Sequence, residues 1–579
     1  MFKKKQEPFY FPCQEIPLQK MDKWRYLDMT TRRQLKIASG RMGFIAFWFL
    51  LAYAIIIGRL FYLTVMNYEP RSFKVGNSQS NYTLARHNIL DRNGLILATS
   101  LPTWDLSVDP AQVKGNPQEV AEKIHSALPD IDTQTIYDKI TSHAGFKYIK
   151  RNLTPKERSA INWLGYYFLA ETKGEKRVYP QGNLVSHLLG GVDIDNIGIA
   201  GIEKAYDTEL MDKDVQLSID VSVQEITRNA LAKGIEKFLA EGGLALVMDI
   251  KTGEILASVS LPDYDPNIPA AKAGKERFNQ ATLGTYEFGS VFKLFNTALG
   301  LESKTITVND IFDTSKPLKI GRKSITDYRG QNRPLMVPEI LMHSSNIGSA
   351  QIALKIGWQK QKEFLGQFGF YDKLPIALPE RGTTQYLKKE PWADMESATV
   401  AYGYGISVTP LHLISGVAAL VNGGLYHTPT FIKGGNEGKS EIRVISEDTS
   451  KKMRHMMWSV VNWDLSQKSP IATYAVGGKT GSANLIINGR YIEKRLRTTF
   501  VGAFPMNDPK YIVMVSMTDP KGIRETFGFN AAGWNAKAVG VNIIGEIAPY
   551  LGVEPVTEWE QPYYITKAFE RSRAAKKGR

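Results

Sequence analysis

A long apolar stretch near the N-terminus dominates the hydrophobic pattern. From Met42 to Ile57 no residue is charged or strongly polar, and beyond Arg59 the apolar run resumes and ends at Met66. As a helix, this stretch would extend over roughly 37 Å, which is enough for a hydrocarbon core of about 30 Å. Arg59 lies near one end, where a long side chain can reach the interface. We therefore predict a single transmembrane helix over residues 42–66.

The residues before this stretch are strongly basic. Positions 1–41 contain ten lysines and arginines but four acidic residues. Basic flanks stay on the cytoplasmic side, so this segment is predicted to be a cytoplasmic tail, with the chain after Met66 outside the cytoplasmic (inner) membrane. A cleaved signal peptide would need a shorter basic region and a small-residue cleavage site, and neither is visible.

Residues 67–235 read as a mixed α/β unit with frequent turns, which we call the pedestal. Leu84–Ser100 predicts two short strands around a turn at Asp91–Gly94. The stretches Val120–Leu128 and Gln134–Ser142 have helical patterns. The glycine-rich stretch 190–201 is typical of a connector into the next unit.

The pattern changes at about Glu236. Residues 244–259 predict a β-hairpin with a Gly-containing turn, and two further strands are expected at Thr498–Pro505 and Tyr511–Thr518. Between them lie apolar helical patterns around Phe292–Leu301, Val337–Ile356 and Leu411–Val421, and the last expected helix is Gly533–Leu551. Strands at both ends with helices between them predict an α+β domain over 236–565, with an antiparallel sheet flanked by helices. A basic tail, 566–579, is expected to be a solvated terminus.

Composition narrows the function. The 579 residues suggest roughly three or four units, and the net charge of +14 suits either an anionic partner or simple solubility. The sequence has no nucleic-acid-binding motif, so no nucleic-acid partner is expected. Cys13 is the one cysteine, which excludes an intrachain disulfide, and no Cys/His spacing would hold zinc. We expect neither a metal nor a cofactor.

The first candidate chemistry is the Ser-x-x-Lys at Ser290 and Lys293, which opens an apolar helical pattern. Residues i and i+3 share one helix face, so the hydroxyl and the amine can meet. The lysine can act as a base only if burial or a neighbouring cation lowers its pKa. The motif alone is weak, since roughly two chance matches are expected in a chain of this size.

Two further motifs strengthen the prediction. Ser344-Ser-Asn346 offers a hydroxyl and a carboxamide between helical patterns, and Lys479-Thr-Gly-Ser482 begins a strand-like stretch. Decoys exist for both, at Lys251-Thr-Gly253 and Ser482-Ala-Asn484. Only Ser290, Ser344 and Lys479 follow the chain order of a penicillin-recognising serine acyltransferase.

Over nearly all of the chain after residue 66, the sequence resembles class B penicillin-binding proteins. The residues that carry this resemblance are 286–293, 344–346 and 478–483, with support from 88–94, 198–203 and 401–410. Phe288 stands where the family usually has proline before Gly-Ser, and His87 stands where glycine is common. The resemblance implies a serine β-lactamase-like transpeptidase domain on an elongated pedestal for dimerisation or interaction.

The resemblance also implies the roles of the site residues. Lys293 would take the proton of Ser290, which attacks the penultimate D-alanine of a peptidoglycan stem peptide. Ser344 would relay a proton and Lys479 would tune the local field. The backbone N–H groups of Ser290 and Ser482 would form the oxyanion hole. The remaining residues would bind substrate: Asn346, Thr480, Gly481 and Ser482. β-Lactams would acylate the same serine.

Several functions remain as alternatives at this point. A D,D-carboxypeptidase differs only in using water as the acceptor, and a serine β-lactamase would not need an anchor and pedestal. A β-lactam sensor or scaffold would not require the catalytic side chains. A glycosyltransferase signature is absent from the sequence, so glycan polymerisation would come from a partner.

Division-specific and elongation-specific relatives share all three motifs. Tyr286-Glu287 and the segments 533–539 and 548–552 look more similar to the division-specific, FtsI type. The resemblance would then imply pairing with an FtsW-type glycosyltransferase and other divisome proteins at the division septum. The acceptor amine, the affinity for β-lactams and the oligomeric state stay open.

Overall fold

A computed structural model of the chain describes Phe44 and residues 47–58, 86–143, 145–268, 274–463, 472–487, 489–556 and 558–577. Of the anchor predicted at 42–66, Phe44 and 47–58 are described and are helical, and the rest lies outside the described residues, as does the basic segment 1–41. Within the part that the structure describes, no helix has the length and apolar character of a membrane span. Residues 82–579 form one compact unit.

The pedestal is built on a long strand, β2 (Ile96–Val108). It pairs antiparallel with β4 (Leu169–Val178), with β3 (Lys147–Leu153) and, at its start, with β1 (Ile89–Leu90). β1 also runs parallel to β7 (Val215–Gln216). The predicted turn at 91–94 is confirmed, because the Asp91 carboxylate accepts the backbone N–H groups of Asn93 and Leu95, both at 2.8 Å.

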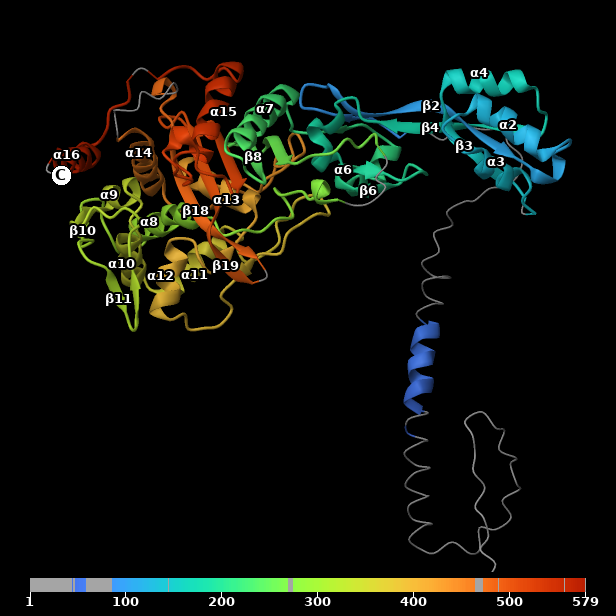
Figure 1. The fold of residues 1–579 in the computed structure, drawn as a ribbon. Helices are drawn as coiled ribbons and strands as arrows, with labels where there is room; N and C mark the ends of the chain where they lie inside the picture. The colour runs from blue at the N-terminus through green and yellow to red at the C-terminus, as the bar shows by residue number, and fades with distance from the viewer. Residues whose placement is uncertain are drawn as a thin grey trace, which may run out of the picture. The chain divides into compact units, whose positions relative to one another are not determined.

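Three helices cover the far end of this sheet (Figure 1): α2 (Pro117–Ala127), α3 (Thr133–Ile140) and α4 (Pro155–Leu164). The helices predicted at 120–128 and 134–142 are therefore confirmed, and both begin at an Asn or Asp N-cap. Short elements complete the pedestal: η3 (Pro110–Gln112), η4 (Gly182–Val185), α5 (Ser186–Leu189), β5 (Gly191–Val192), β6 (Gly198–Ala200), α6 (Gly201–Ala205) and η5 (Glu209–Met211).

Buried ion pairs join the motif segment 198–203 to Arg86 and Arg177. Glu203 is fully buried, and its two carboxylate oxygens bind Arg86 Nε at 2.6 Å and Arg177 Nε at 2.7 Å. Such a carboxylate is tolerated in a protein interior only when it is paired. The turn of the β1–β2 hairpin also reaches the α+β domain, where Lys433 Nζ donates to the Arg92 carbonyl at 3.0 Å.

The α+β domain is built around an antiparallel sheet in the order β18-β19-β20-β8-β9, which confirms the predicted architecture. Its strands are β8 (Gly242–Asp249), β9 (Ile255–Leu261), β18 (Gly477–Ile487), β19 (Arg490–Phe504) and β20 (Tyr511–Thr518). Strands from the two ends of the domain, far apart in sequence, thus lie side by side, because β8 pairs with β20 along its whole length.

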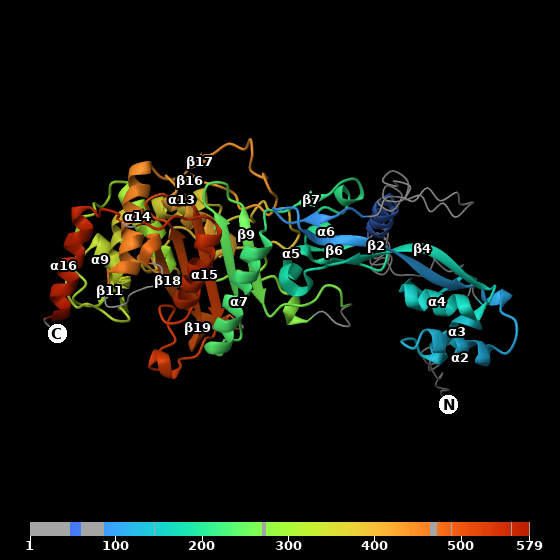
Figure 2. The same ribbon diagram turned by 90° about the horizontal axis from the view of Figure 1, so that it is seen from above.

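Helices cover both faces of this sheet (Figures 1 and 2), and the side chains on both faces are buried. Leu244, Leu246 and Met248 of β8 face one core, whereas Ala245 and Val247 face the other, as the alternation of a strand requires. The first core contains α8 (Lys293–Glu302) and α13 (Pro410–Val421), and the second contains α7 (Val221–Lys237) and α15 (Ala536–Tyr550).

The helical pattern at 337–356 divides at residues 343–345 into α9 (Val337–Met342) and α10 (Asn346–Ile356). The remaining helices are α11 (Trp358–Gln367), α12 (Asp394–Ala401) and α14 (Glu447–Asn462), with η6 (Lys275–Arg277), η7 (Gly289–Phe292), η8 (Ala472–Tyr474) and η9 (Arg524–Thr526). Short strands pair as β10 (Ile311–Phe312) with β13 (Leu335–Met336), β11 (Leu318–Ile320) with β12 (Lys323–Ile325), β14 (Gln385–Tyr386) with β15 (Ile406–Ser407), and β16 (Leu425–Tyr426) with β17 (Ile442–Arg443).

The C-terminal segment differs from the expectation of a solvated tail. Residues Tyr563–Lys577 form a helix, α16, with Ile565 and Ala568 fully buried. Arg571 Nε donates to the buried Glu339 of α9 at 2.8 Å. Gly533–Leu551 is therefore not the last helix, and Arg573 and Lys576 lie on the exposed face of a docked helix.

Candidate active site

Ser290 lies in a tight turn, η7, immediately before α8. Gly289 precedes it with φ of 52°, and a Cβ at Gly289 would meet the carbonyl oxygen of Ser482 at 2.9 Å. A Cβ at Gly403 would in turn lie 2.1 Å from the carbonyl oxygen of Gly289. Glycine at 289 therefore allows both the left-handed backbone and the close approach of this turn to β18.

Phe288 precedes this turn where the family usually has proline. Its φ is −104°, which differs from the value near −65° that a proline ring imposes. Its side chain is buried, and its ring packs edge-on against Tyr286. Phe288 thus has a φ angle that proline would not adopt, and the chain still forms the turn η7 after it.

Lys293 lies one turn after Ser290 with its side chain fully buried. Its Nζ is 2.9 Å from Ser290 Oγ, 2.6 Å from the Ser344 carbonyl oxygen and 2.7 Å from Asn346 Oδ1. Burial lowers the pKa of Lys293 well below its ordinary value, and the neighbouring Lys479 lowers it further. A neutral amine that donates to the two shorter contacts keeps a lone pair for the Ser290 hydroxyl.

Ser344 lies in the break between α9 and α10. Its φ is 55°, an uncommon angle for a residue with a side chain. Its Oγ lies 3.2 Å from Lys293 Nζ and accepts from Lys479 Nζ at 3.0 Å. The hydroxyl that the sequence predicted as a proton relay therefore lies between the two lysines.

Lys479 is carried by β18, next to Ser344. Its Nζ also donates to the Thr480 carbonyl at 2.9 Å, and burial lowers the pKa of Lys479 to about 7. Together with Ser344 and Thr480 it lines a cavity of about 280 Å³ between α14, β18 and the start of α15. This cavity gives a ligand access to one side of the cluster.

The remaining predicted residues lie on β18 beside the turn at Ser290. A Cβ at Gly481 would lie 2.1 Å from the Phe288 carbonyl oxygen, so glycine permits close contact here. Ser482 Oγ accepts from the Ala532 backbone N–H at 3.1 Å. The structure thus brings Ser290, Lys293, Ser344, Asn346 and Lys479 into one hydrogen-bonded group, with Thr480 and Ser482 on the adjoining strand.

Sequence reasoning did not identify three residues around this group. Asp327 binds the Ser345–Ile347 segment, and the Arg497 guanidinium stacks on the Tyr286 ring with its centre 3.6 Å from the ring centroid. Glu287 accepts from the Gly405 N–H at 2.8 Å and from the Tyr491 hydroxyl at 2.9 Å. Only Glu287 carried a signal, its position within the matched motif 286–293. The decoy Lys251 lies in the β8–β9 turn, as predicted.

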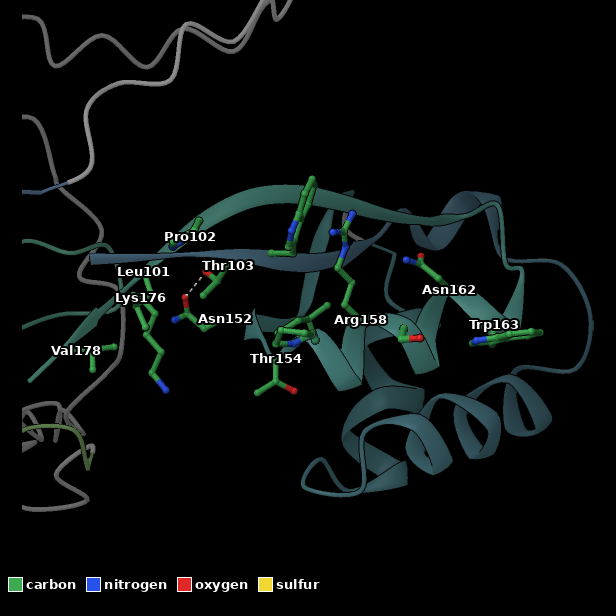
Figure 3. Close-up of a pocket in the computed structure, with 14 residues that line it drawn as sticks. Leu101, Pro102, Thr103, Asn152, Thr154, Arg158, Asn162, Trp163, Lys176 and Val178 are labelled. Atoms are coloured by element: carbon green, nitrogen blue, oxygen red, sulfur yellow. Dashed lines mark hydrogen bonds between the residues drawn. The ribbon is translucent and has the colours of Figure 1, made fainter. Parts of the chain in front are cut away.

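A second hollow lies in the pedestal (Figure 3). It has a volume of about 930 Å³ and is bounded by β2, β4, the end of β3 and α4. Trp163 is largely exposed there, and the Arg158 guanidinium stacks on Trp104 with its centre 3.6 Å from the ring centroid. The described residues that line it include no Asp, Glu, His or Cys, so it does not supply an acid–base pair.

Comparison with known proteins agrees with this geometry. Residues 243–539 match the penicillin binding protein transpeptidase domain, and residues 83–233 match the penicillin-binding protein dimerisation domain. The chain belongs to the penicillin-binding protein family.

Relatives of this penicillin-binding protein cover most of its length. It is 34% identical over 490 residues to the "Probable peptidoglycan D,D-transpeptidase FtsI" of Caulobacter vibrioides, covering 82% of each chain. It is 30% identical over 567 residues to "Stage V sporulation protein D" of Bacillus subtilis, covering 89% of this chain and 86% of the relative. It is 27% identical over 522 residues to "Peptidoglycan D,D-transpeptidase FtsI" of Escherichia coli, covering 83% and 88%. The chain is therefore a transpeptidase of the FtsI type.

The fold also matches that of a solved structure, a peptidoglycan synthetase from Bifidobacterium adolescentis. The TM-score is 0.66 at 21% sequence identity, and the alignment covers 83% of this chain and 97% of that one. At this identity the match shows the fold of the penicillin-binding protein.

Proposed function

We propose that this penicillin-binding protein cross-links peptidoglycan stem peptides through an acyl-enzyme on Ser290. The observation that carries the proposal is the buried Lys293 Nζ, 2.9 Å from Ser290 Oγ, beside a second buried lysine. Burial and that second cation favour a neutral amine, which is the form that can accept a proton. The names of the relatives from Caulobacter vibrioides and Escherichia coli support the substrate class.

In the acylation step, the Ser290 hydroxyl gives its proton to Lys293 while Oγ bonds to the carbonyl carbon of the penultimate D-alanine. The backbone N–H groups of Ser290 and Ser482 stabilise the oxyanion, a contribution of several kcal/mol. The carbon–nitrogen bond to the terminal D-alanine then breaks. The proton passes from Lys293 through the Ser344 hydroxyl to the departing amine. The contacts of Ser344 Oγ with both lysines support this route.

In the second step, an acceptor amine attacks the ester carbonyl of the acyl-enzyme. The proton lost from the amine returns to Ser290 Oγ through Lys293, which regenerates the hydroxyl. Attack by water would give a carboxypeptidase instead. The ratio of cross-linked to hydrolysed product therefore distinguishes the two reactions.

Substrate binding falls to the residues around this group. Asn346 holds the peptide amide, and Thr480 and Ser482 bind the terminal carboxylate near the Lys479 charge. Gly481 supports the assignment because its lack of a side chain lets β18 lie against the turn that precedes Ser290. β-Lactams present the same carbonyl and carboxylate and would acylate Ser290.

The narrower proposal is a role in cell division. The relatives named FtsI support it, whereas the Bacillus subtilis relative carries a sporulation name. Depletion of the protein is expected to give filaments without septa. Rounded cells would indicate an elongation role instead.

We also propose a single-pass location in the cytoplasmic membrane. Residues 42–66 would form the anchor, 67–235 the pedestal and 236–565 the catalytic domain, outside the membrane at the septum. The apolar run and its basic flank support this arrangement. Partners would be an FtsW-type glycosyltransferase and other divisome proteins.

Covalent labelling of the full-length protein by a fluorescent penicillin tests the nucleophile. Ser290→Ala is expected to abolish the adduct. Lys479→Ala is expected to reduce labelling, while Lys251→Ala, in the second Lys-Thr-Gly sequence, is expected to leave it unchanged. Labelling that survives Ser290→Ala would overturn the assignment.

A further inference from the structure

The segment that carries Ser344 and Asn346 is held by a residue outside the three motifs. Asp327 Oδ1 accepts the backbone N–H groups of Asn346 at 2.5 Å and Ile347 at 3.0 Å. Its Oδ2 accepts the Ser345 hydroxyl at 2.7 Å. One carboxylate thus binds three donors at the start of α10, where backbone N–H groups have no helical partner.

The carboxylate is placed by a small hairpin. Asp327 follows β12, whose Ile325 is buried against Ile347 and Ala350 of α10. The contact fixes the end of the β11–β12 hairpin on the same helix whose first turn Asp327 binds. The hairpin and the helix therefore hold the carboxylate in one position relative to the Ser344–Asn346 segment.

The same segment of chain sets the orientation of the Asn346 amide. Asn346 Nδ2 donates to the Thr326 carbonyl at 3.1 Å, which directs Oδ1 toward Lys293 Nζ at 2.7 Å. An Asn346 amide turned the other way would present N–H groups to the amine and lose this acceptor. The direction of the Lys293 lone pair toward Ser290 depends on that acceptor.

We propose that Asp327 is a positioning residue for acylation, fixing the Ser344–Asn346 segment and thereby the direction in which Lys293 faces Ser290. This inference rests on the proposed function, since it assumes that Ser290 is the nucleophile. Asp327 touches no reacting atom. It acts through the three groups that it binds, together with the Asn346 side-chain amide that the neighbouring Thr326 carbonyl holds.

The charge of Asp327 supplies a second effect that can be measured. The charged groups that act on Lys293 are Lys479 of β18 and Asp327, and its other contacts, Ser290, Ser344 and Asn346, are neutral. Burial and Lys479 lower the pKa of Lys293, and Asp327 opposes them. Removing this anion lowers the Lys293 pKa further, so the free amine persists to lower pH.

The test is the second-order rate constant for acylation of the full-length protein by a fluorescent penicillin, measured against pH. Asp327→Ala is expected to lower it by ~10–100-fold, because small displacements of catalytic groups cost that much. Ser345→Ala removes one of the three contacts but keeps the anion, so a smaller loss of the acylation rate constant is expected. The fall of the rate at low pH, the acid limb of the pH profile, should not move. Asp327→Asn keeps an acceptor, and its acid limb is expected at lower pH.

Asp313→Asn is the matched control. Asp313 also accepts from a nearby serine, Ser315, by backbone N–H and hydroxyl, and it is exposed and lies outside the group around Ser290. The Asp313→Asn variant should be acylated at the same rate as the wild type. If Asp327→Ala does not fold, as judged by thermal unfolding, Asp327→Asn decides alone through its pH profile.

Acylation of Asp327→Ala within about twofold of a wild type that labels normally would overturn the inference. An Asp327→Asn acid limb that coincides with that of Ser345→Ala would overturn it as well. A wild type that forms no adduct on Ser290 would instead count against the proposed function, so the two failures are distinguishable.

Discussion

Lys293 Nζ and Lys479 Nζ lie 3.2 Å and 3.0 Å from the same atom, the Oγ of Ser344. Two buried cations cannot share one hydroxyl without strong mutual repulsion, which favours a single proton charge across the pair. This division of roles, one neutral amine and one cation, is what the proposed acylation requires. It also makes the site sensitive to pH.

The first prediction concerns the rate of acylation at alkaline pH. Burial lowers the pKa of Lys479 to about 7, so above this pH the cation is lost and a penicillin carboxylate is held less well. Acylation should therefore slow as pH rises through about 7. Lys479→Arg keeps its charge at all accessible pH values, so its alkaline limb should move to higher pH even if its maximum rate falls. Superimposable alkaline limbs would show that Lys479 does not set this limb.

The second prediction separates backbone strain from chemistry at Ser344. Both Ser344→Ala and Ser344→Gly remove the hydroxyl, and both should lose acylation to a similar degree. Because φ is 55°, glycine relieves a left-handed angle that costs a side-chain residue about 1–2 kcal/mol. Ser344→Gly should therefore unfold at a higher temperature than Ser344→Ala. The reverse order in calorimetry would contradict the strained geometry.

The third prediction concerns Gly289. Gly289→Ala places a Cβ against the Ser482 carbonyl oxygen at 2.9 Å and adds left-handed strain at φ of 52°. Gly321→Ala adds the same strain, with φ of 58°, but meets nothing within 4 Å. Both variants should be slightly less stable, and only Gly289→Ala should lose penicillin labelling. Equal labelling of the two would mean that the contact between this turn and β18 is not needed.

The fourth prediction concerns the docked helix α16. Arg571 binds Glu339, whose side chain is fully buried, so Arg571→Ala should lower the free energy of unfolding by roughly 1–3 kcal/mol. Arg573→Ala is the control, since Arg573 stacks loosely on Phe569 at 5.9 Å from the ring centroid. Chemical denaturation of the two variants compares the effects. Equal stability would mean that α16 does not depend on this ion pair.

Much of the catalytic domain was predictable because its signals are local. The strands at both ends and the helices between them follow from apolar periodicity, and the order of Ser290, Ser344 and Lys479 excluded the decoys. The pairing of β8 with β20 could not be read in the same way, because it joins segments far apart in the chain.

The missed features share a physical cause. Asp327 follows a short, mostly exposed hairpin, and the residues around it in the sequence do not indicate that its carboxylate reaches the start of α10. Arg497 lies in a strand where a charged residue normally points outward, yet it is buried against Tyr286. α16 is polar on most positions, so its composition suggested a tail, and only its few buried residues reveal the docked face.

Cross-linking by this penicillin-binding protein requires an acyl-enzyme on Ser290 that an amine resolves. The most direct measurement is mass spectrometry of the full-length protein incubated with a stem pentapeptide, without and then with an acceptor amine. An acyl adduct is expected on the peptide that contains Ser290, and it should disappear when the acceptor is added and yield a cross-linked product. An adduct on another residue, or a product that is only hydrolysed in the presence of the acceptor, would contradict it.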